Sequence, residues 1–251
     1  MKVSIVIPTF NSEKDIYSLF GSLRSYSIDS KTEIIIVDAG SNDRTLEKIK
    51  EYGSAKIIKA GFVSKGKARN IGIKESKGDV IVNIDSDVRI TSQWFDELQK
   101  SMKVENIVAG FSPDPREKQL PRVPIYINGQ DITYPCCNIA HKREVFENVG
   151  YYNEVQNLPE DIEFNYRCVK AGYTISYNPK MKLYHYQRSN WKGFCKQAFW
   201  NGEARYELNK LHPELKSKSQ HGASFKNLVR LGFGFFGYTI GRYYKKKGEK
   251  I

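Results

Sequence analysis

The chain has 251 residues, 40% of them hydrophobic, which is enough to bury the core of one large α/β domain or of two small ones. Its four cysteines lack a Cys-x-x-Cys spacing, which argues against a zinc site or a disulfide framework and indicates thiols in a reducing compartment. The net charge of +12 arises entirely in residues 180–251, with sixteen Lys or Arg and four Glu, so this segment is expected to meet an anionic partner.

Strands and helices alternate along the first part of the chain. Val3–Ile7 is a short apolar run that follows a single lysine, which indicates a buried strand rather than a signal peptide. Asn11 or Ser12 is expected to cap the next helix, Asn42 a second one and Thr91 a later one. This order of elements favours an α/β fold with a doubly wound sheet. The other expected elements are strands at 33–37, 55–58, 79–84 and 104–111, and helices at 13–25 and 65–76.

The character of the sequence changes after residue 112. Five of the nine prolines fall between Pro113 and Pro135, which argues against an ordinary helix or a central strand. A binding loop or lid and a plain surface excursion both fit such a segment. Further along the chain, helices are expected from His141, from Glu160 to residue 171 and over 191–211, with short strands at 173–177 and 182–186.

Residues 225–244 predict a last helix with an apolar stripe and basic flanks. Its uncharged run, 231–241, has eleven residues, whereas a membrane-spanning helix needs about 20. A helix of this kind suits the headgroup region of an anionic membrane surface. Packing of the same helix on the body of the protein, or on a second copy of it, is the alternative.

A metal site is expected where the strand at 79–84 ends. Asp85 and Asp87 leave that strand one residue apart, and ligands of open α/β sheets bind beyond the carboxyl ends of the strands. Carboxylate oxygens are hard ligands that suit Mg²⁺ or Mn²⁺ when the ion is also held by phosphates of a substrate. A solvated turn is the alternative for an isolated Asp-Ser-Asp.

Five short motifs and one histidine, taken in their order along the chain, resemble the family 2 glycosyltransferases of the GT-A fold. They cover residues 1 to about 190 and are Val6-Ile7-Pro8-Thr9-Phe10-Asn11, Ile36-Val37-Asp38-Ala39-Gly40-Ser41-Asn42-Asp43, Gly66-Lys67-Ala68-Arg69-Asn70, Asp85-Ser86-Asp87, Pro159-Glu160-Asp161 and His185. The resemblance implies an α/β, Rossmann-like GT-A domain in residues 1–215, with a doubly wound mixed sheet flanked by helices. A basic amphipathic helical tail would follow in residues 216–251.

The resemblance also implies a role for the matched acidic residues. Asp161 would be the general base, Glu160 would orient the reacting groups, and Asn138 would contact the acceptor. For the acid pair, the simpler interpretation is a favourable charge in the first turn of a helix, worth about 0.3–1 kcal/mol.

A donor site and a metal site follow from the same resemblance. The metal ligands would be Asp87, His185 and Asp85, with Mg²⁺ or Mn²⁺ as the ion. The residues expected to bind the nucleotide sugar are Pro8, Thr9, Asn11, Asp38, Lys67, Arg69, Asp85 and Ser86. Simpler interpretations remain: Asp38 as a helix cap, Lys67 and Arg69 as a solvated first turn, and His185 as a packed core residue.

The expected function is therefore inverting, metal-dependent transfer of one sugar from a UDP- or GDP-sugar to a hydroxyl of a lipid-linked or membrane-associated acceptor. Gln187-Arg188-Ser189-Asn190-Trp191 has asparagine where processive members of the resembled family carry arginine, which favours a single transfer per encounter. A cytoplasmic enzyme, peripheral on the inner membrane face and without a nucleic-acid partner, is expected. The alternatives are a nucleotidyltransferase, against which the absence of a glycine-rich loop at Pro8–Asn11 argues, and a non-catalytic binder of membranes or nucleic acid.

Overall fold

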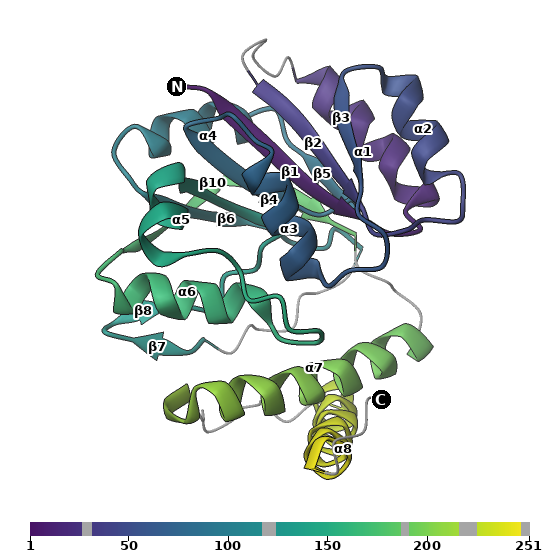
Figure 1. Cartoon of the computed structure of the whole chain (residues 1–251), viewed down its shortest axis with the longest axis vertical. Coiled ribbons are helices and arrows are strands. Elements are labelled where there is room, and N and C mark those ends of the chain that lie inside the picture. The colour runs from purple at the N-terminus through teal and green to yellow at the C-terminus, as the bar shows by residue number, and fades with distance from the viewer. Residues whose placement is uncertain (27–31, 117–123, 187–190, 216–224, 247–251) are drawn as a thin grey trace.

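An eight-stranded mixed sheet forms the centre of the computed structural model, which describes residues 1–26, 32–116, 124–186, 191–215 and 225–246 (Figure 1). The strand order is β3-β2-β1-β4-β9-β6-β10-β5. The strands are β1 (Val3–Thr9), β2 (Thr32–Asp38), β3 (Ala55–Lys59), β4 (Val80–Ile84), β5 (Val88–Ile90), β6 (Ile107–Phe111), β9 (Asn138–Lys142) and β10 (Ile175–His185). A separate small hairpin pairs β7 (Tyr126–Ile127) with β8 (Gln130–Asp131) inside the proline-rich segment.

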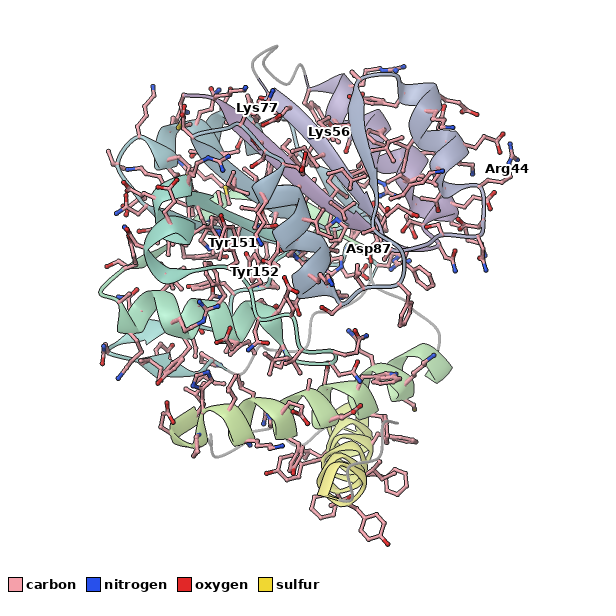
Figure 2. The ribbon with its side chains drawn as sticks, in the orientation of Figure 1. Arg44, Lys56, Lys77, Asp87, Tyr151 and Tyr152 are labelled. Carbon is pink, nitrogen blue, oxygen red and sulfur yellow. The ribbon has the colours of Figure 1, made fainter. Side chains whose placement is uncertain are left out.

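The parallel part of the sheet places several loops at one edge. β1 pairs in parallel with both β2 and β4, and Thr9 lies opposite Asp38 in the register. The carboxyl ends of these three strands therefore open toward the same side of the molecule, which is where ligands bind in such sheets. Figure 2 shows Asp87 at this edge, beyond the end of β4.

Helices cover both faces of the sheet, because the central strands are apolar on both sides. In β1, Ile5 and Ile7 pack into the core beneath α1 (Glu13–Ser25), α2 (Thr45–Tyr52) and α4 (Trp94–Met102), whereas Val6 packs into a second core. This second core lies against α5 (Arg143–Val149) and α6 (Glu160–Lys170). Helix α3 (Lys65–Lys74) covers the same face as Val6, since a Cβ on Gly72 would overlap the Val6 side chain.

The starts of α1 and α2 differ from the predicted caps. One carboxylate, that of Asp43, accepts the backbone N–H of Glu13 at 3.1 Å and that of Thr45 at 3.0 Å, so it serves the first turns of both helices. Neither Asn42 nor Ser12 caps a helix with its side chain. The predicted cap at Thr91 is also wrong, because its hydroxyl donates to the carbonyl of Lys182 and α4 begins only at Trp94.

Two further predictions fail in the second half of the sheet. His141 does not begin a helix; it lies in β9, which runs antiparallel between β4 and β6, and α5 begins at Arg143. Its ring is fully buried against Phe146 and Phe164, and this burial lowers the pKa of His141 to about 3. The two short strands expected at 173–177 and 182–186 form the single strand β10, which is irregular between Asn178 and Lys182.

Two long helices follow the sheet. Helix α7 (Trp191–Leu211) is followed by a short 3₁₀ turn, η1 (Pro213–Leu215), and α8 (Phe225–Lys246) crosses α7 in Figure 1. Their backbones touch at glycines: a Cβ on Gly202 would overlap the Gly234 carbonyl, and one on Gly237 would overlap the Phe199 carbonyl. Within the described ranges, no helix combines the length and apolar character needed to cross a bilayer. The predicted junction at 215/216 borders residues 216–224, which lie outside those ranges.

Candidate active site

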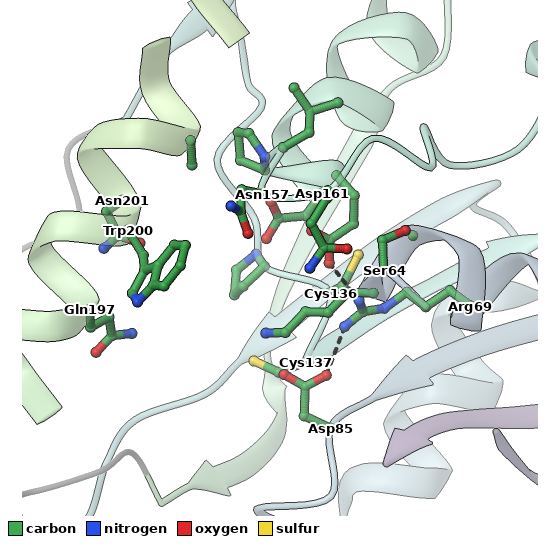
Figure 3. A pocket seen from close by; sticks show the side chains of 18 of the residues that line it. Ser64, Arg69, Asp85, Cys136, Cys137, Asn157, Asp161, Gln197, Trp200 and Asn201 are labelled. Atoms are coloured by element: carbon green, nitrogen blue, oxygen red, sulfur yellow. Dashed lines mark hydrogen bonds and ion pairs between the residues drawn. The ribbon is translucent and has the colours of Figure 1, made fainter. Parts of the chain in front are cut away.

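A cavity of about 620 Å³ opens at the carboxyl edge of the sheet, within the range usual for small-molecule sites. Asp85, Asp87 and His185 line it from the strand ends, and Glu160 and Asp161 line it from the start of α6. Figure 3 shows the opposite wall, which is made by α7. The predicted metal ligands and the predicted base therefore face one shared space.

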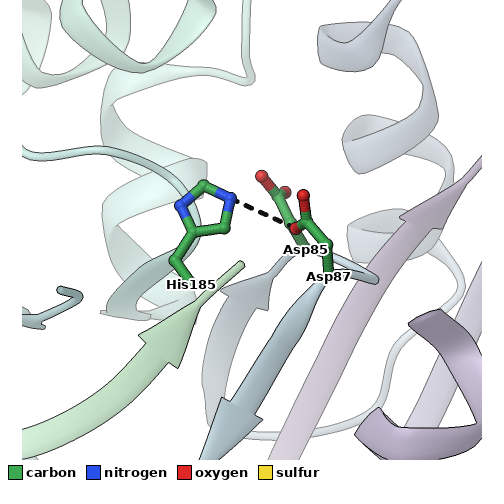
Figure 4. A group of neighbouring side chains, drawn as sticks. All are labelled: Asp85, Asp87 and His185. Carbon is green, nitrogen blue, oxygen red and sulfur yellow. Dashed lines mark ion pairs between the residues drawn. The ribbon is translucent and has the colours of Figure 1, made fainter. Parts of the chain in front are cut away.

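Three ligand atoms converge at the end of β4. One atom each from Asp85, Asp87 and His185 lies within 4.8 Å of the other two, and Figure 4 shows the imidazole pointing at the two carboxylates. Nε2 of His185 lies 3.2 Å from Oδ1 of Asp87. The grouping predicted from Asp-Ser-Asp and a distant histidine is thus present in three dimensions, brought together by the antiparallel pairing of His185 in β10 with Val88 in β5.

The electrostatics of this group fit a cation. Oδ1 of Asp87 is buried and, apart from its 3.2 Å approach to Nε2 of His185, has no hydrogen-bond partner among the described residues. Burial by itself lowers the pKa of His185, but its interactions with Asp87 and Cys137 raise that pKa to about 11 overall. A place that stabilises an imidazolium so strongly also stabilises a divalent cation, and an Asp₂His donor set suits Mn²⁺ or Mg²⁺.

Arg69 connects the two acidic parts of the cavity. Its Nη1 donates to Glu160 Oε1 at 2.5 Å and its Nη2 to Asp85 Oδ1 at 2.7 Å, while the side chain is only 1% exposed. Glu160 is 91 residues from Arg69 along the chain, and Asp85 is 16 residues from it. The guanidinium therefore fixes these two carboxylates relative to each other. This arrangement differs from the direct phosphate contact expected for Arg69, because both terminal nitrogens are already engaged by carboxylates.

The lysine that faces the cavity is Lys65 rather than Lys67. Helix α3 begins at Lys65, and residues four apart share a helix face, so Lys65 lies on the same side as Arg69. Lys67 is exposed and lines no part of the cavity. The Asp85 carboxylate raises the pKa of Lys65, which keeps an ammonium group in the cavity. Ser64 caps this helix by accepting from the Lys67 N–H at 3.2 Å.

Asp161 has the properties of a base that works near neutral pH. Burial, with the neighbouring Glu160 carboxylate as the second cause, raises the pKa of Asp161 to about 6. The backbone N–H of Ile162 donates to its Oδ1 at 2.8 Å. A carboxylate with a pKa close to the working pH is suited to accept a proton from a substrate hydroxyl.

The loops after β1 and β2 form a connected unit at the same edge of the sheet, although their predicted residues do not line the cavity. Asp38 accepts from the N–H groups of Gly40 and Ser41, from the Ser41 hydroxyl at 2.5 Å, and from Thr9 at 3.4 Å. Its carboxylate thus closes its own turn, close to the capping role that was the simpler interpretation. Asn11, at a positive φ of 48°, accepts from the N–H of Asn42 and joins the two loops. A nucleobase contact at Asp38, Thr9, Pro8 and Asn11 remains a prediction.

Two predicted residues lie elsewhere. Asn138 is 1% exposed in β9; its amide donates to the carbonyls of Phe111 and Met181, and its Oδ1 accepts from the Trp94 indole. These bonds use it to join β6, β9, β10 and α4, which corrects the expected acceptor contact. The hydroxyl of Ser86 pairs with that of Ser12 at 2.8 Å, and Ser86 does not line the cavity.

Sequence reasoning missed the contribution of α7. Six of its residues, spaced as one helix face, line the cavity: Gly193, Lys196, Gln197, Trp200, Asn201 and Ala204. The spacing i, i+3, i+4, i+7, i+8, i+11 is visible in the sequence, but three of the six residues are polar and one is glycine, so it gives no apolar stripe to detect. The Gln187–Trp191 element lies largely outside the described residues.

Comparison with known proteins identifies the family and the fold. Residues 4–170 match the family model described as glycosyl transferase family 2. The chain is 32% identical over 228 residues to the poly(ribitol-phosphate) β-N-acetylglucosaminyltransferase TarS of Staphylococcus aureus, covering 84% of this chain and 40% of the relative. It is 34% identical over 107 residues to the dolichol-phosphate mannosyltransferase of Pyrococcus furiosus, a match that covers 41% of this chain and 30% of the relative. The chain thus spans well under half the length of these relatives.

Solved structures share the architecture at low identity. A structure of S. aureus TarS residues 1–349 superposes with a TM-score of 0.64 and 16% identity, covering 99% of this chain and 92% of that one. The mannosyltransferase PcManGT from Pyrobaculum calidifontis, in complex with GDP-Man and Mn²⁺, superposes with a TM-score of 0.67 and 14% identity. The match covers 100% of this chain and 76% of that one. The predicted GT-A fold is confirmed.

Proposed function

Because the chain belongs to glycosyl transferase family 2, we propose that it is an inverting, metal-dependent enzyme that moves one sugar from a UDP- or GDP-sugar to a hydroxyl acceptor. One observation carries this proposal: the Asp85–Asp87–His185 group and Asp161 line the same cavity. A single displacement needs charge neutralisation at the leaving group and a base at the acceptor, and this cavity offers both.

The donor end of the cavity would lie at the strand ends. Asp87 and His185, with Asp85, would hold Mg²⁺ or Mn²⁺, and the ion would offset the negative charge of the departing diphosphate. The ammonium of Lys65 lies beside the same group and would contact a phosphate oxygen directly. Thr9 and Asp38 lie at the carboxyl ends of β1 and β2, on the same edge of the sheet as the end of β4, and their loops would hold the base and ribose.

Asp161 would act on the acceptor. Its carboxylate takes the proton from the acceptor hydroxyl while the oxygen forms a bond to the anomeric carbon of the donor. The bond from that carbon to the diphosphate oxygen breaks at the same time, and the electron pair leaves with the nucleoside diphosphate. Attack opposite the leaving group inverts the anomeric centre. Arg69 contributes by holding Glu160 and Asp85, the neighbours of the two reacting ends, in a fixed relation.

Two features of α8 support a peripheral membrane location at the cytoplasmic face, with a lipid-linked or membrane-associated acceptor. The helix sequence holds five Lys or Arg and no acidic residue. Phe233, Phe235 and Phe236 are 43%, 72% and 56% exposed, although α8 also packs on α7. Exposed aromatic side chains among basic residues bind anionic membrane surfaces. Among the relatives, the dolichol-phosphate mannosyltransferase is named for a lipid phosphate.

The alternatives receive less support. A nucleotidyltransferase does not follow from the family match, and a non-catalytic binder leaves the converging carboxylates and His185 without a role.

A thermal-shift experiment tests the proposal. UDP or GDP with Mn²⁺ should raise the melting temperature of the wild-type protein, because a ligand that binds only the folded state at about 100 times its Kd adds about 2.7 kcal/mol of stability. The Asp87→Ala variant should lose this metal-linked shift, and a chelator should abolish it in the wild type. The matched variant Asp96→Asn, an exposed acid in the first turn of α4, should keep it. Stabilisation that is equal with and without metal would contradict the metal-dependent mechanism.

A further inference from the structure

One face of α7 closes the cavity opposite the charged groups. The residues of this face, here called the α7 face, are Gly193, Lys196, Gln197, Trp200, Asn201 and Ala204. A helix face directed at a protein core is normally aliphatic at these spacings. The α7 face instead combines one large aromatic ring with two carboxamides and a lysine, a mixture typical of a surface that binds a polar, ring-shaped ligand.

Packing on the other side of α7 fixes this face toward the cavity. The close approaches of Gly202 to Gly234 and of Phe199 to Gly237 hold α7 against α8. On the cavity side, the Asn157 amide donates to Glu203 at 3.4 Å, which ties α7 to the loop that leads into Asp161. The α7 face is therefore positioned by contacts on both sides and does not depend on a ligand to form.

Trp200 is the prominent group on this face. It is 38% exposed and meets Phe199 edge-on, with ring centroids 6.0 Å apart, and no aromatic ring among the described residues stacks on it. Figure 3 shows its indole projecting from α7 toward the side of the cavity that holds Asn157 and Asp161. Gln197 and Asn201 flank it, one turn before and one residue after, and neither side-chain amide hydrogen-bonds to a described residue.

We propose that the α7 face is the acceptor subsite and that the acceptor presents a pyranose ring, stacked on Trp200 and hydrogen-bonded through its hydroxyls to Gln197 and Asn201. A pyranose has a flat C–H surface that matches an indole and a rim of hydroxyls that matches carboxamide donors and acceptors. A lipid chain in the same place would leave both carboxamides unsatisfied. The inference rests on the proposed function, since it places the acceptor on the Asp161 side of the same cavity.

Kinetics with simple acceptors test this subsite. The probes are methyl glycosides of glucose, mannose, galactose and N-acetylglucosamine, compared with ribitol and glycerol phosphate as acyclic polyols. With donor and Mn²⁺ present, at least one pyranoside should saturate transfer. Trp200→Leu should raise its KM about tenfold, and Trp200→Tyr should restore most of the affinity because a ring is kept. Gln197→Ala should raise the same KM by a smaller factor.

Matched measurements separate the possible results. Tyr17→Ala removes an aromatic side chain that is 70% exposed on α1, outside the cavity, and should leave the acceptor KM as in the wild type. If the wild type binds nucleotide and metal but uses only the acyclic polyols, or if Trp200→Leu leaves the pyranoside KM unchanged, the inference is overturned while the proposed function stands. If the wild type binds no nucleotide at all, the proposed function fails, and the inference fails with it.

Discussion

The two walls of the cavity are built on different physical terms. The wall at the sheet edge is a network of ionised groups. In it Arg69, 1% exposed, bridges Asp85 and Glu160 beside the candidate metal ligands Asp87 and His185. The wall made by α7 presents the exposed side chains of Trp200, Gln197 and Asn201. A dense ionic network resists rearrangement because each charge would be costly to leave unpaired. The α7 face can change its side chains at little cost to folding.

This difference agrees with the proposed roles, in which the first wall carries out the reaction and the second selects the acceptor. The proposed reaction needs fixed charges and a tuned base, the roles proposed for the sheet edge and for Asp161 at the start of α6. Recognition of one acceptor among many needs a surface that can vary without unfolding the protein. Substitutions at the charged wall should therefore alter the rate, the stability or the pH profile, whereas those on α7 should alter the acceptor KM.

The largest effect is expected for Asp161→Asn. Loss of the base should lower the rate of transfer by about 10²–10⁴-fold, whereas binding of nucleotide and metal should persist because the Asp85–Asp87–His185 group is untouched. Rates come from release of nucleoside diphosphate, and binding from thermal shift. Asp96→Asn on α4 serves as the control for loss of a helix first-turn acid. If Asp161→Asn kept more than a tenth of the wild-type rate, Asp161 would not be the general base. The proposed assignment of the reaction to the charged wall would then be contradicted.

The next effect concerns stability. Arg69→Met leaves Glu160 and Asp85 without their shared partner and should lower the free energy of unfolding by about 3–5 kcal/mol, as measured by urea denaturation. Arg44→Met is the matched control, since Arg44 also binds a carboxylate, that of Glu47 at 2.9 Å, but is 61% exposed. Figure 2 shows Arg44 at the outer surface. This control should leave the free energy of unfolding close to that of the wild type, because an exposed, solvent-screened ion pair contributes little. Equal losses for the two variants would show that burial of the Arg69 network is not what stabilises this wall.

The smallest of the three effects is a shift of the pH profile. Because Asp161 must be deprotonated to act and its pKa is raised to about 6, kcat/KM should rise with pH up to about 6 and level off above it. Glu160→Gln removes the neighbouring negative charge that contributes to the raised pKa, so the acidic limb should move to lower pH. Gln197→Ala on α7 should leave the limb in place even if it raises the acceptor KM. If the acidic limb of the kcat/KM profile did not move in Glu160→Gln, a group other than Asp161 would control the pH dependence.

Much of the charged wall could be predicted from the sequence, because short motifs follow strand ends. Asp85, Asp87 and Asp161 lie where a strand end and a helix start were expected, and the fold class follows from the alternation of elements. The errors fall where local signals mislead. Lys67 is a more conspicuous match than Lys65, yet the helix starts at residue 65 and its periodicity selects Lys65. Asn138 and His141 carry polar side chains in a strand that is buried by pairing on both sides.

The sequence by itself determined the elements, the carboxylates at their ends and the family resemblance, since these depend on residues close together along the chain. Only the tertiary structure decided which side chains meet: Arg69 with Glu160, His185 with Asp87, and α7 with the cavity. Each of these meetings joins segments that are distant in sequence, and each depends on sheet order and helix packing. Those long-range arrangements are set by burial of the whole core rather than by any local motif.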